Sequence, residues 1–481
     1  MNKLRTSGVS LALVFLMGIG ALRAQALRPR AVRFGPNIDL SAAQPATLWH
    51  HEPAIGANPS DPKNLVAGYF GHLTQNSSIG CFAAYTADAG TTWAPAGTVP
   101  LASIYDACFD PSIAADASGT FYYGYLDFHG TPDGVLTTTD IRVARSTDGG
   151  RSFTEFSTPV VGQIGFGESD PDKPWITVDS QPKSRFRGTI YVTFTDLVFF
   201  SPSTGDFMIK SMVSRDGGKT WSTPVIVSRL VDVFSSQLVL DSLTVIAPDG
   251  TAYLVYHDFD TAAIRDSIKF VKSKDGGKTW SQPADVAANI PSPGLYQLDN
   301  GDPHFGTGST FGVSASSYPT AAVAPDGTIY VAWADFAQGH CVPEPSSGIP
   351  ACYNADVRLS VSKDGGGSWS TPRKVNDDAT SADQFLPWIA TGPDGLLSLI
   401  WQDRRLDPKL IDYDLFYTNT ADGRTFLPNV RVSSQSSNVD AAFFEGDYNN
   451  LAVTSEGIFP AWNDGRFNSV QIFTARGTLA P

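Results

Sequence analysis

The sequence has little charge and few cysteines. Only 17% of its 481 residues are charged, and 34 basic against 48 acidic side chains give a formal net charge of 34 − 48 = −14. This balance excludes nucleic acid as a partner and provides no general attraction for an anionic polymer. The four cysteines show neither a Cys-x-x-Cys nor a Cys/His spacing, which argues against a zinc site.

Long apolar runs are also scarce. One apolar stretch, Gly8 to Ala21, follows two basic residues and precedes Ala24-Gln25-Ala26, the order of a secretory leader with its cleavage site. It is short for a membrane span, no cysteine follows it for a lipid anchor, and no second stretch of spanning length occurs. We therefore expect a signal peptide over 1–26, one domain over 27–481, no membrane insertion, and a secreted or periplasmic location.

The cysteines predict disulfides if the chain is exported, because oxidising compartments favour them. Cys341 and Cys352 bracket a segment rich in proline, glycine and serine and are expected to pair locally. Cys81 and Cys108 would then form the second pair.

A short motif, Ser/Thr-x-Asp-x-Gly-x-x-Trp/Phe, runs through the chain. Its copies begin at Thr86, Ser146, Ser214, Ser273, Ser362 and, one residue shorter, Thr420. The Asp is suited to accept backbone N–H groups in a tight turn, the Gly to a positive φ, and the aromatic residue to anchor the turn by burial. Each copy therefore predicts a hairpin turn, and a repeat at this spacing predicts a repeat architecture.

A second repeat alternates with the first. It consists of an apolar strand, a turn such as Pro325-Asp326-Gly327, and a strand that ends in an aromatic residue and an Asp. Seven such units are present, and together with the first motif they predict four strands per unit. The segment Phe34–Ser41 matches Phe426–Ser433, which follows the sixth copy of the first motif. The N-terminal segment therefore reads as an orphan fourth strand that completes the last unit and closes a ring.

The repeat also predicts where a ligand would bind. The tight turns all lie on one face, whereas both long insertions, 287–317 and 336–355, fall on the opposite face with the ends of the second strands and the starts of the first strands. Carboxylates, arginines and indoles gather there. Paired carboxylates suit glycoside hydrolysis, aromatic rings stack on sugars, and arginines bind carboxylates in bidentate fashion.

The candidate residues follow from this placement. The candidate catalytic residues are Asp403, Asp464, Glu445, Asp447 and Tyr448, and the candidate substrate-binding residues are Arg404, Arg405, Arg466, Trp401, Trp462, Asp335 and Asp258. Each has a structural alternative: an Asp that ends a strand often bonds turn amides, the Trp-x-Asp-x-Arg groups could be structural ion pairs, and the tryptophans could be core residues.

The first motif resembles the Asp-box (BNR) repeat of the sialidase-like β-propellers. The resemblance covers nearly the whole mature chain and implies an all-β, single propeller of four-stranded antiparallel blades. Our repeat count gives seven blades, and six, as in many sialidases, is the alternative. Sialidases bind their substrate's carboxylate with three arginines and carry a Phe/Tyr-Arg-Ile/Leu-Pro motif, which this chain lacks, since Arg33-Phe34-Gly35-Pro36 does not match it.

The sequence leaves two candidate functions. The first is an exo-acting glycoside hydrolase on terminal sugars of a glycan, and the alternative is a non-catalytic propeller that binds a glycan or a protein. We expect a carbohydrate ligand, a monomer and no required cofactor, with Ca²⁺ held by a ring of carboxylates as the alternative.

Overall fold

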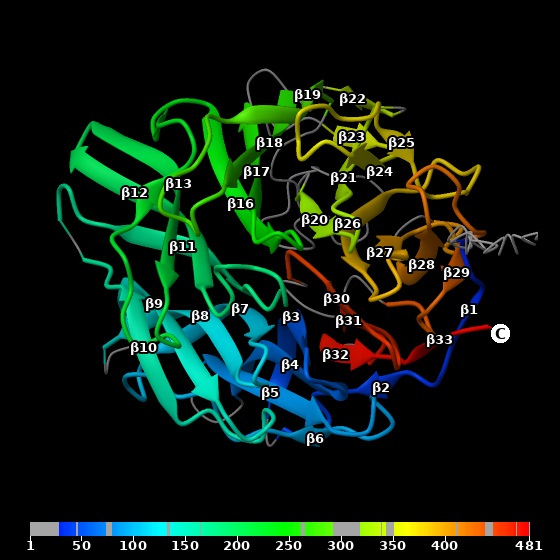
Figure 1. Ribbon diagram of the computed structural model, residues 1–481, viewed down its shortest axis with the longest axis horizontal. Coiled ribbons are helices and arrows are strands. Elements are labelled where there is room, and N and C mark those ends of the chain that lie inside the picture. The colour runs from blue at the N-terminus through cyan, green and yellow to red at the C-terminus, as the bar shows by residue number, and fades with distance from the viewer. Residues whose placement is uncertain are drawn as a thin grey trace, which may run out of the picture.

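Seven antiparallel sheets follow one another around a central axis as the blades of a β-propeller (Figure 1). The computed structural model describes residues 28–44, 47–73, 79–131, 135–163, 165–260, 265–291, 318–337, 339–342, 351–409, 412–437, 446–467 and 469–480. The predicted fold class, an all-β propeller with seven blades, is confirmed. Within these ranges no helix has the length and apolarity needed to cross a bilayer. The proposed signal peptide lies outside the described residues.

The first four blades are built from strands that are consecutive in the chain. Blade 1 contains β3 (Thr47–Asn58), β4 (Asp61–Leu73), β5 (Ile79–Thr86) and β6 (Ala94–Pro95). Blade 2 contains β7 (Ala107–Ala115), β8 (Phe121–Gly130), β9 (Leu136–Ser146) and β10 (Glu155–Val160). Blade 3 contains β11 (Asp170–Val178), β12 (Ile190–Ser201), β13 (Thr204–Ser214), β14 (Val225–Ile226) and β15 (Val231–Asp232). Blade 4 contains β16 (Gln237–Ile246), β17 (Ala252–Asp260), β18 (Arg265–Ser273) and β19 (Ala284–Ile290).

The last three blades carry an inserted hairpin and the ring closure. Blade 5 contains β20 (Thr320–Val323), β21 (Ile329–Asp335), β24 (Asp356–Ser362) and β25 (Arg373–Lys374), and the hairpin is β22 (His340–Val342) with β23 (Ala351–Tyr353). Blade 6 contains β26 (Gln384–Thr391), β27 (Leu397–Asp403), β28 (Asp414–Thr420) and β29 (Val430–Arg431). Blade 7 contains β30 (Asn450–Thr454), β31 (Gly457–Asp464), β32 (Gln471–Thr474) and β2 (Ile38–Asp39), and β1 (Val32–Phe34) pairs with β33 (Gly477–Leu479) beside it.

The N-terminal segment closes the ring as predicted. In β2, Ile38 pairs with Thr474 and Asp39 with Phe473 of β32, so the fourth strand of blade 7 comes from the start of the chain. Figure 1 shows this contact as a blue strand beside red ones. Because β2 covers the edge of β32, blade 7 has the same four-stranded build as the others.

The innermost strands form a closed ring around the axis. Each first strand contacts the first strand of the next blade, in the order β3, β7, β11, β16, β20, β26 and β30, and β30 contacts β3 again. Residues from blades that are distant in sequence therefore meet where these seven strands begin.

The Asp-box turns have the predicted geometry. In the third copy, Asp216 Oδ1 accepts hydrogen bonds from the Ser214 hydroxyl (2.8 Å) and from the Thr220 N–H (3.0 Å). Gly218 has φ of 82°, the left-handed region that favours glycine. The indole of Trp221 donates to the Ser157 hydroxyl of blade 2 at 3.1 Å, so the aromatic residue fastens the turn to the neighbouring blade.

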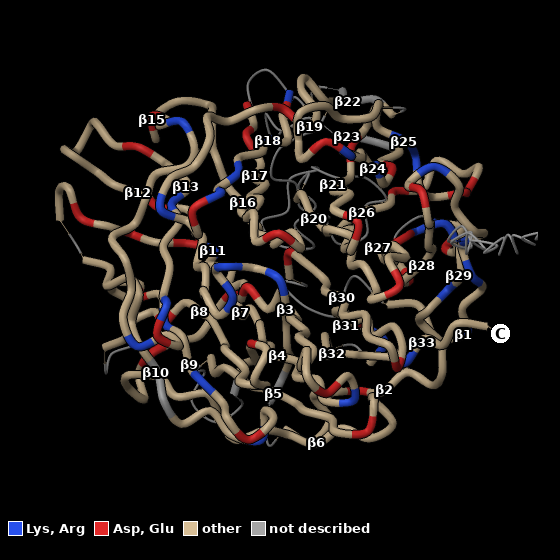
Figure 2. Tube along the Cα trace, in the orientation of Figure 1, with Lys and Arg blue, Asp and Glu red and all other residues tan. Residues whose placement is uncertain are grey.

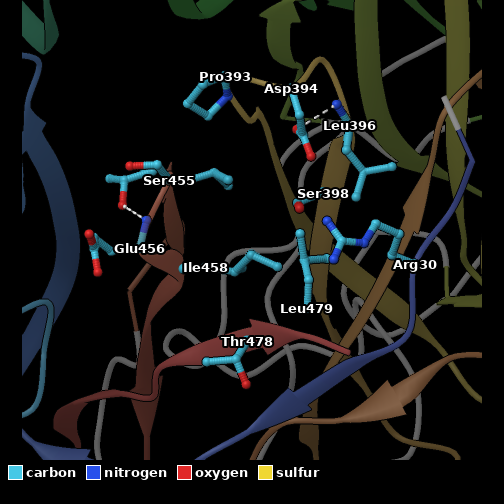
Figure 3. A pocket seen from close by; sticks show the side chains of 13 residues that line it. Arg30, Pro393, Asp394, Leu396, Ser398, Ser455, Glu456, Ile458, Thr478 and Leu479 are labelled. Atoms are coloured by element: carbon cyan, nitrogen blue, oxygen red, sulfur yellow. Dashed lines mark hydrogen bonds between the residues drawn. The ribbon is translucent and has the colours of Figure 1, made fainter. Parts of the chain in front are cut away.

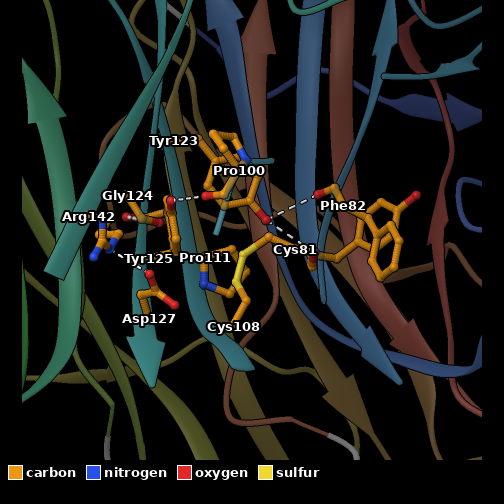
Figure 4. The surroundings of a disulfide bond; sticks show 12 residues. Cys81, Phe82, Pro100, Cys108, Pro111, Tyr123, Gly124, Tyr125, Asp127 and Arg142 are labelled. Carbon is orange, nitrogen blue, oxygen red and sulfur yellow. Dashed lines mark hydrogen bonds and ion pairs between the residues drawn. A yellow bond between two sulfur atoms is a disulfide. The ribbon is translucent and has the colours of Figure 1, made fainter. Parts of the chain in front are cut away.

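One of the predicted disulfides is present and joins blades 1 and 2. Cys81 of β5 is bonded to Cys108 of β7, where buried Tyr123 and Tyr125 surround it (Figure 4). Cys341 and Cys352 are register partners in the inserted hairpin, and their side chains lie outside the described ones. This hairpin occupies part of the insertion predicted between 336 and 355, and most of the insertion over 287–317 lies outside the described residues.

Candidate functional site

The two carboxylates first proposed as catalytic, Asp403 and Asp464, are saturated with internal hydrogen bonds. Asp403 Oδ2 accepts from the Trp401 indole at 2.8 Å and from Arg405 Nε at 2.9 Å. Asp464 Oδ2 accepts in the same way from the Trp462 indole (2.8 Å) and from an Arg466 Nη2 (2.6 Å). The Oδ1 atoms accept from Arg405 N and from Arg466 N and Nε. Trp-x-Asp-x-Arg is therefore a repeated structural unit in blades 6 and 7.

The arginines that were predicted to bind a substrate already have partners within the protein. Arg405 also bonds Asp377 Oδ1 (2.6 Å) and lies over the Phe416 ring, and Arg466 lies over the Phe473 ring. Arg404 is fully buried, and its Nη1 lies 3.8 Å from Asp383. These contacts hold the guanidiniums within blades 6 and 7.

The other predicted ligand-binding carboxylates also have partners. Asp335 accepts from the Trp333 indole (2.8 Å) and from Arg358 Nε (3.0 Å). Asp258 forms a bidentate pair with Arg229, at 3.0 and 2.7 Å. Trp401 and Trp462 are buried between strands, as the structural alternative expected. Of the predicted set, the structure brings Asp447 and Tyr448 to the axis, and Glu445 lies outside the described residues.

A bulge at the start of the first strand recurs from blade to blade. Pairing with the second strand is interrupted in β3, β7, β11, β16 and β26. At this point a non-glycine residue adopts a positive φ in each of these strands, and the five residues are Glu52 (56°), Asp110 (51°), Lys173 (51°), Asp241 (61°) and Leu386 (47°). Such conformations cost about 1–3 kcal/mol each and concentrate at functional sites.

The bulges direct charged and aromatic side chains to the axis. We call the group the axial cluster, and its members are Glu52, Asp110, Asp172, Lys173, Asp241, Tyr318, Asp447 and Tyr448. They come from six blades, and side chains from opposite sides of the ring influence one another electrostatically. Figure 2 shows acidic segments at several points near the centre of the ring. Of these eight residues, the sequence analysis selected Asp447 and Tyr448 and missed the other six.

Lys173 is the cation at the centre of the axial cluster. Its Nζ lies 3.2 Å from Asp110 Oδ1 and 3.6 Å from the centroid of the Tyr448 ring. Tyr318 lies at 5.3 Å from the same nitrogen. Burial alone would lower the pKa of Lys173, but the negative charge of Asp110 and its neighbours outweighs this effect and raises the pKa well above its ordinary value.

Three carboxyls of the axial cluster are hard to ionise. Burial raises the pKa of Asp172 to about 7, and the charge of Asp110 adds to the effect. Burial also raises the pKa of Asp447 to about 7, although Lys173 opposes it. Burial raises the pKa of Glu52 well above its ordinary value, and a hydrogen bond to Asp110 contributes. Asp172 is enclosed by enough protein to raise its pKa, yet part of the residue still meets solvent, whereas Glu52 is buried. The cluster therefore extends from the interior to solvent.

Aromatic rings flank the axial cluster. The rings of Trp175 and Trp388 lie 4.9 Å apart, and Tyr448 lies 6.0 and 6.3 Å from them. The Tyr448 hydroxyl donates to the Pro111 carbonyl at 2.9 Å, which fixes the ring in place. These contacts orient Tyr448 below the Lys173 ammonium.

The sequence held a signal for this site. A proline follows the bulge residue in four strands and follows Tyr318 in blade 5, and these pairs are Glu52-Pro53, Asp110-Pro111, Lys173-Pro174, Tyr318-Pro319 and Leu386-Pro387. Proline disfavours the right-handed helical conformation in the preceding residue, which suits a bulge. This third repeat marks four of the eight residues of the axial cluster: Glu52, Asp110, Lys173 and Tyr318.

Among the described residues, one group of three could hold a metal ion: Asp106, Asp127 and His129. The His129 ring nitrogens already contact Asp106 (3.2 Å) and Asp140 (3.0 Å), and the Arg142 guanidinium contacts Asp127. A guanidinium beside the carboxylates repels a divalent cation, so these residues fit a network of ion pairs better than a Ca²⁺ site.

A hollow of about 460 Å³ lies on the opposite face, between blades 6 and 7 (Figure 3). The β26–β27 and β30–β31 turns, Arg30 and Leu479 line it, and the Arg30 guanidinium is bonded to the Ala480 carbonyl. Its lining holds no cluster of carboxyls comparable with the axial cluster. We therefore take the axial cluster as the candidate site.

The comparisons with known proteins identify the repeat. The family model of the BNR/Asp-box repeat matches residues 212–223, so the recognition of this repeat is confirmed. The search of curated proteins finds no match.

Several solved propellers are similar to this chain. One is the α-L-arabinofuranosidase Arb93A of Fusarium graminearum, with 15% identity and a TM-score of 0.47 over 77% of this chain and 93% of that one. Another is the Hadza microbial sialidase Hz136, with 14% identity and a TM-score of 0.48 over 94% and 95%. A third is the Trypanosoma rangeli sialidase, with 13% identity and a TM-score of 0.43 over 94% and 59%. All three TM-scores are below 0.5, so nothing is inferred about this chain from these similarities.

Proposed function

We propose that the protein is an exported glycoside hydrolase that removes terminal sugars from a glycan, and that its reacting carboxyls belong to the axial cluster. One observation carries the proposal. Asp172 and Asp447 lie in one cluster, and the pKa of each is raised to about 7. Glycoside hydrolysis requires one carboxyl that gives a proton and one that accepts a proton or attacks the sugar. Carboxyls that titrate near neutral pH suit this exchange.

The surrounding residues support the division of roles. Asp172 is exposed, so it is the carboxyl that a terminal sugar reaches first, and we assign it as the acid. Asp447, beside Lys173, is assigned as the base or nucleophile because the ammonium favours its charged form. Trp175 and Trp388 are buried and pack against Tyr448, so they support the ring of that residue.

Hydrolysis of a panel of aryl glycosides, a sialoside included, tests the proposal. We expect turnover by the wild type, with and without Ca²⁺, and loss of at least about a hundredfold in kcat in both Asp172→Asn and Asp447→Asn. Asp403→Asn and Asp464→Asn serve as matched controls, since these carboxylates are saturated by Trp and Arg donors. Loss of turnover in the controls alone, with folding intact, would move the site to the rim of blades 6 and 7.

The second candidate is a propeller that binds a glycan without cleaving it. The saturation of Asp403 and Asp464 favours it, because carboxylates with every acceptor position filled do not transfer protons. Absence of turnover together with binding on a glycan array would select this alternative.

A further inference from the structure

The axial cluster is rich in carboxyl groups, three of which are hard to ionise, and contains one ammonium. It has five carboxyls, from Glu52, Asp110, Asp172, Asp241 and Asp447, whereas Lys173 is its single ammonium. The guanidiniums of Arg405, Arg466 and Arg404 have Asp403, Asp464 and Asp383 as partners. With five carboxyls and one ammonium, the cluster offers few cationic partners to a ligand that carries a carboxylate.

The Lys173 ammonium is itself already satisfied. It contacts Asp110 at 3.2 Å and stacks over the Tyr448 ring at 3.6 Å. The Asp110 carboxylate and the Tyr448 ring thus surround the ammonium with groups that favour a positive charge. An anionic group could reach it only by displacing Asp110.

Two buried oxygens of the axial cluster lack a hydrogen-bond partner. They are Glu52 Oε2 and Asp447 Oδ1, and Glu52 as a residue is only 3% exposed. An unpartnered carboxyl oxygen in the interior costs free energy unless a donor reaches it. A hydroxyl or an ammonium group is such a donor, and a ligand carboxylate is not.

A buried histidine supports the axial cluster on the blade 4 side. His257 is fully buried, its Nε2 lies 2.9 Å from Asp266, and its Nδ1 lies 3.7 Å from Asp241. The imidazole thereby holds the bulge carboxylate of blade 4 next to the axis.

We propose that the axial cluster selects a terminal sugar without a carboxylate, and that a sugar with a free amino group binds most tightly. This inference rests on the proposed function in one respect, namely that the ligand is a sugar. The amino group would sit among the unpartnered carboxyl oxygens of Glu52 and Asp447, whereas sialic and uronic acids would bind more weakly. Ionisation of nearby carboxyls on binding would release protons to the buffer.

Isothermal titration calorimetry on the full-length protein tests the inference. The probes are matched sets in the gluco and galacto configurations: the neutral sugar, the 2-amino-2-deoxy sugar and the uronic acid, together with sialic acid. We expect the amino sugar to bind at least tenfold more tightly than the neutral sugar, and the acidic sugars to bind at least tenfold more weakly than the neutral one. Binding enthalpy measured in two buffers of different ionisation enthalpy should show proton release.

Variants assign the effect to the cluster. Glu52→Gln and Asp447→Asn should each reduce the preference for the amino sugar at least fivefold, and Asp394→Asn, in the hollow on the opposite face, should leave it unchanged. Tighter binding of an acidic sugar overturns the inference and leaves the hydrolase proposal intact if aryl glycosides are cleaved. No binding by any probe overturns the inference, whereas the expected order of binding without any turnover supports it and overturns only the hydrolase proposal.

Discussion

The buried histidine of blade 4 should make stability depend on pH. His257 lies between Asp266 (2.9 Å) and Asp241 (3.7 Å) with no exposed surface. Burial opposes its charged form, but the two carboxylates outweigh burial and raise the pKa of His257 from 6.5 to about 9. Because the pKa is higher in the folded chain, the stabilisation is fully present below pH 6.5 and is lost as pH rises through about 9.

The size of the effect follows from the two pKa values. The interval from 6.5 to about 9 corresponds to about 3.5 kcal/mol, at about 1.4 kcal/mol per pH unit. Replacement by glutamine keeps a donor but removes the charge between two buried carboxylates. We therefore expect His257→Gln to lower the free energy of unfolding by about 3.5 kcal/mol at pH 6 and by much less at pH 10.

Two measurements check this. Denaturant unfolding of wild type and variant between pH 6 and pH 10 gives the difference directly, and NMR of labelled imidazoles gives the midpoint of His257. The control is His129→Gln, because His129 also contacts two carboxylates but its side chain is 28% exposed, so its loss should be smaller. A difference that stays constant from pH 6 to pH 10, or a His257 midpoint below 7, would refute the reasoning.

Three further predictions concern the closure, the disulfide and the site. Deletion of residues 31–41 should lower Tm and cause association at high protein concentration, because the edge of β32 is exposed, and calorimetry with light scattering would reveal an unaffected chain if the closure is unimportant. Replacing Cys81 and Cys108 by alanine should cost about 3.5 kcal/mol in denaturant unfolding, from the entropy of a loop with a sequence separation of 27, and a loss below 1 kcal/mol would contradict this. The profile of kcat/KM against pH should have its maximum near 7, because the pKa values of Asp172 and Asp447 are about 7, and a profile that Asp172→Asn does not alter would contradict their role.

The sequence predicted the repeat units because each is a local structure. In Ser214–Trp221, the Asp, the Gly and the Trp act within eight residues, so the turn could be predicted without knowledge of distant parts. Counting the units gave seven blades, and the match of 34–41 with 426–433 gave the closure, since strand order follows from the repeat.

The choice among candidate carboxylates could not be made from the sequence. Asp403 and Asp447 both stand on the predicted face, but Asp403 is saturated by its own Trp and Arg, whereas Asp447 retains an unpartnered oxygen. The difference depends on side-chain direction and on which groups approach from other blades, and one blade's sequence specifies neither.

What the sequence by itself determined is the blade: its turns, its number of copies and the strand that closes the ring, all set by hydrogen bonds and burial over short distances. What only the tertiary structure decided is the meeting of Glu52, Asp110, Lys173 and Tyr448, which come from four different blades. Ring closure places them together, and burial among like charges then raises the carboxyl pKa values on which the proposed chemistry depends.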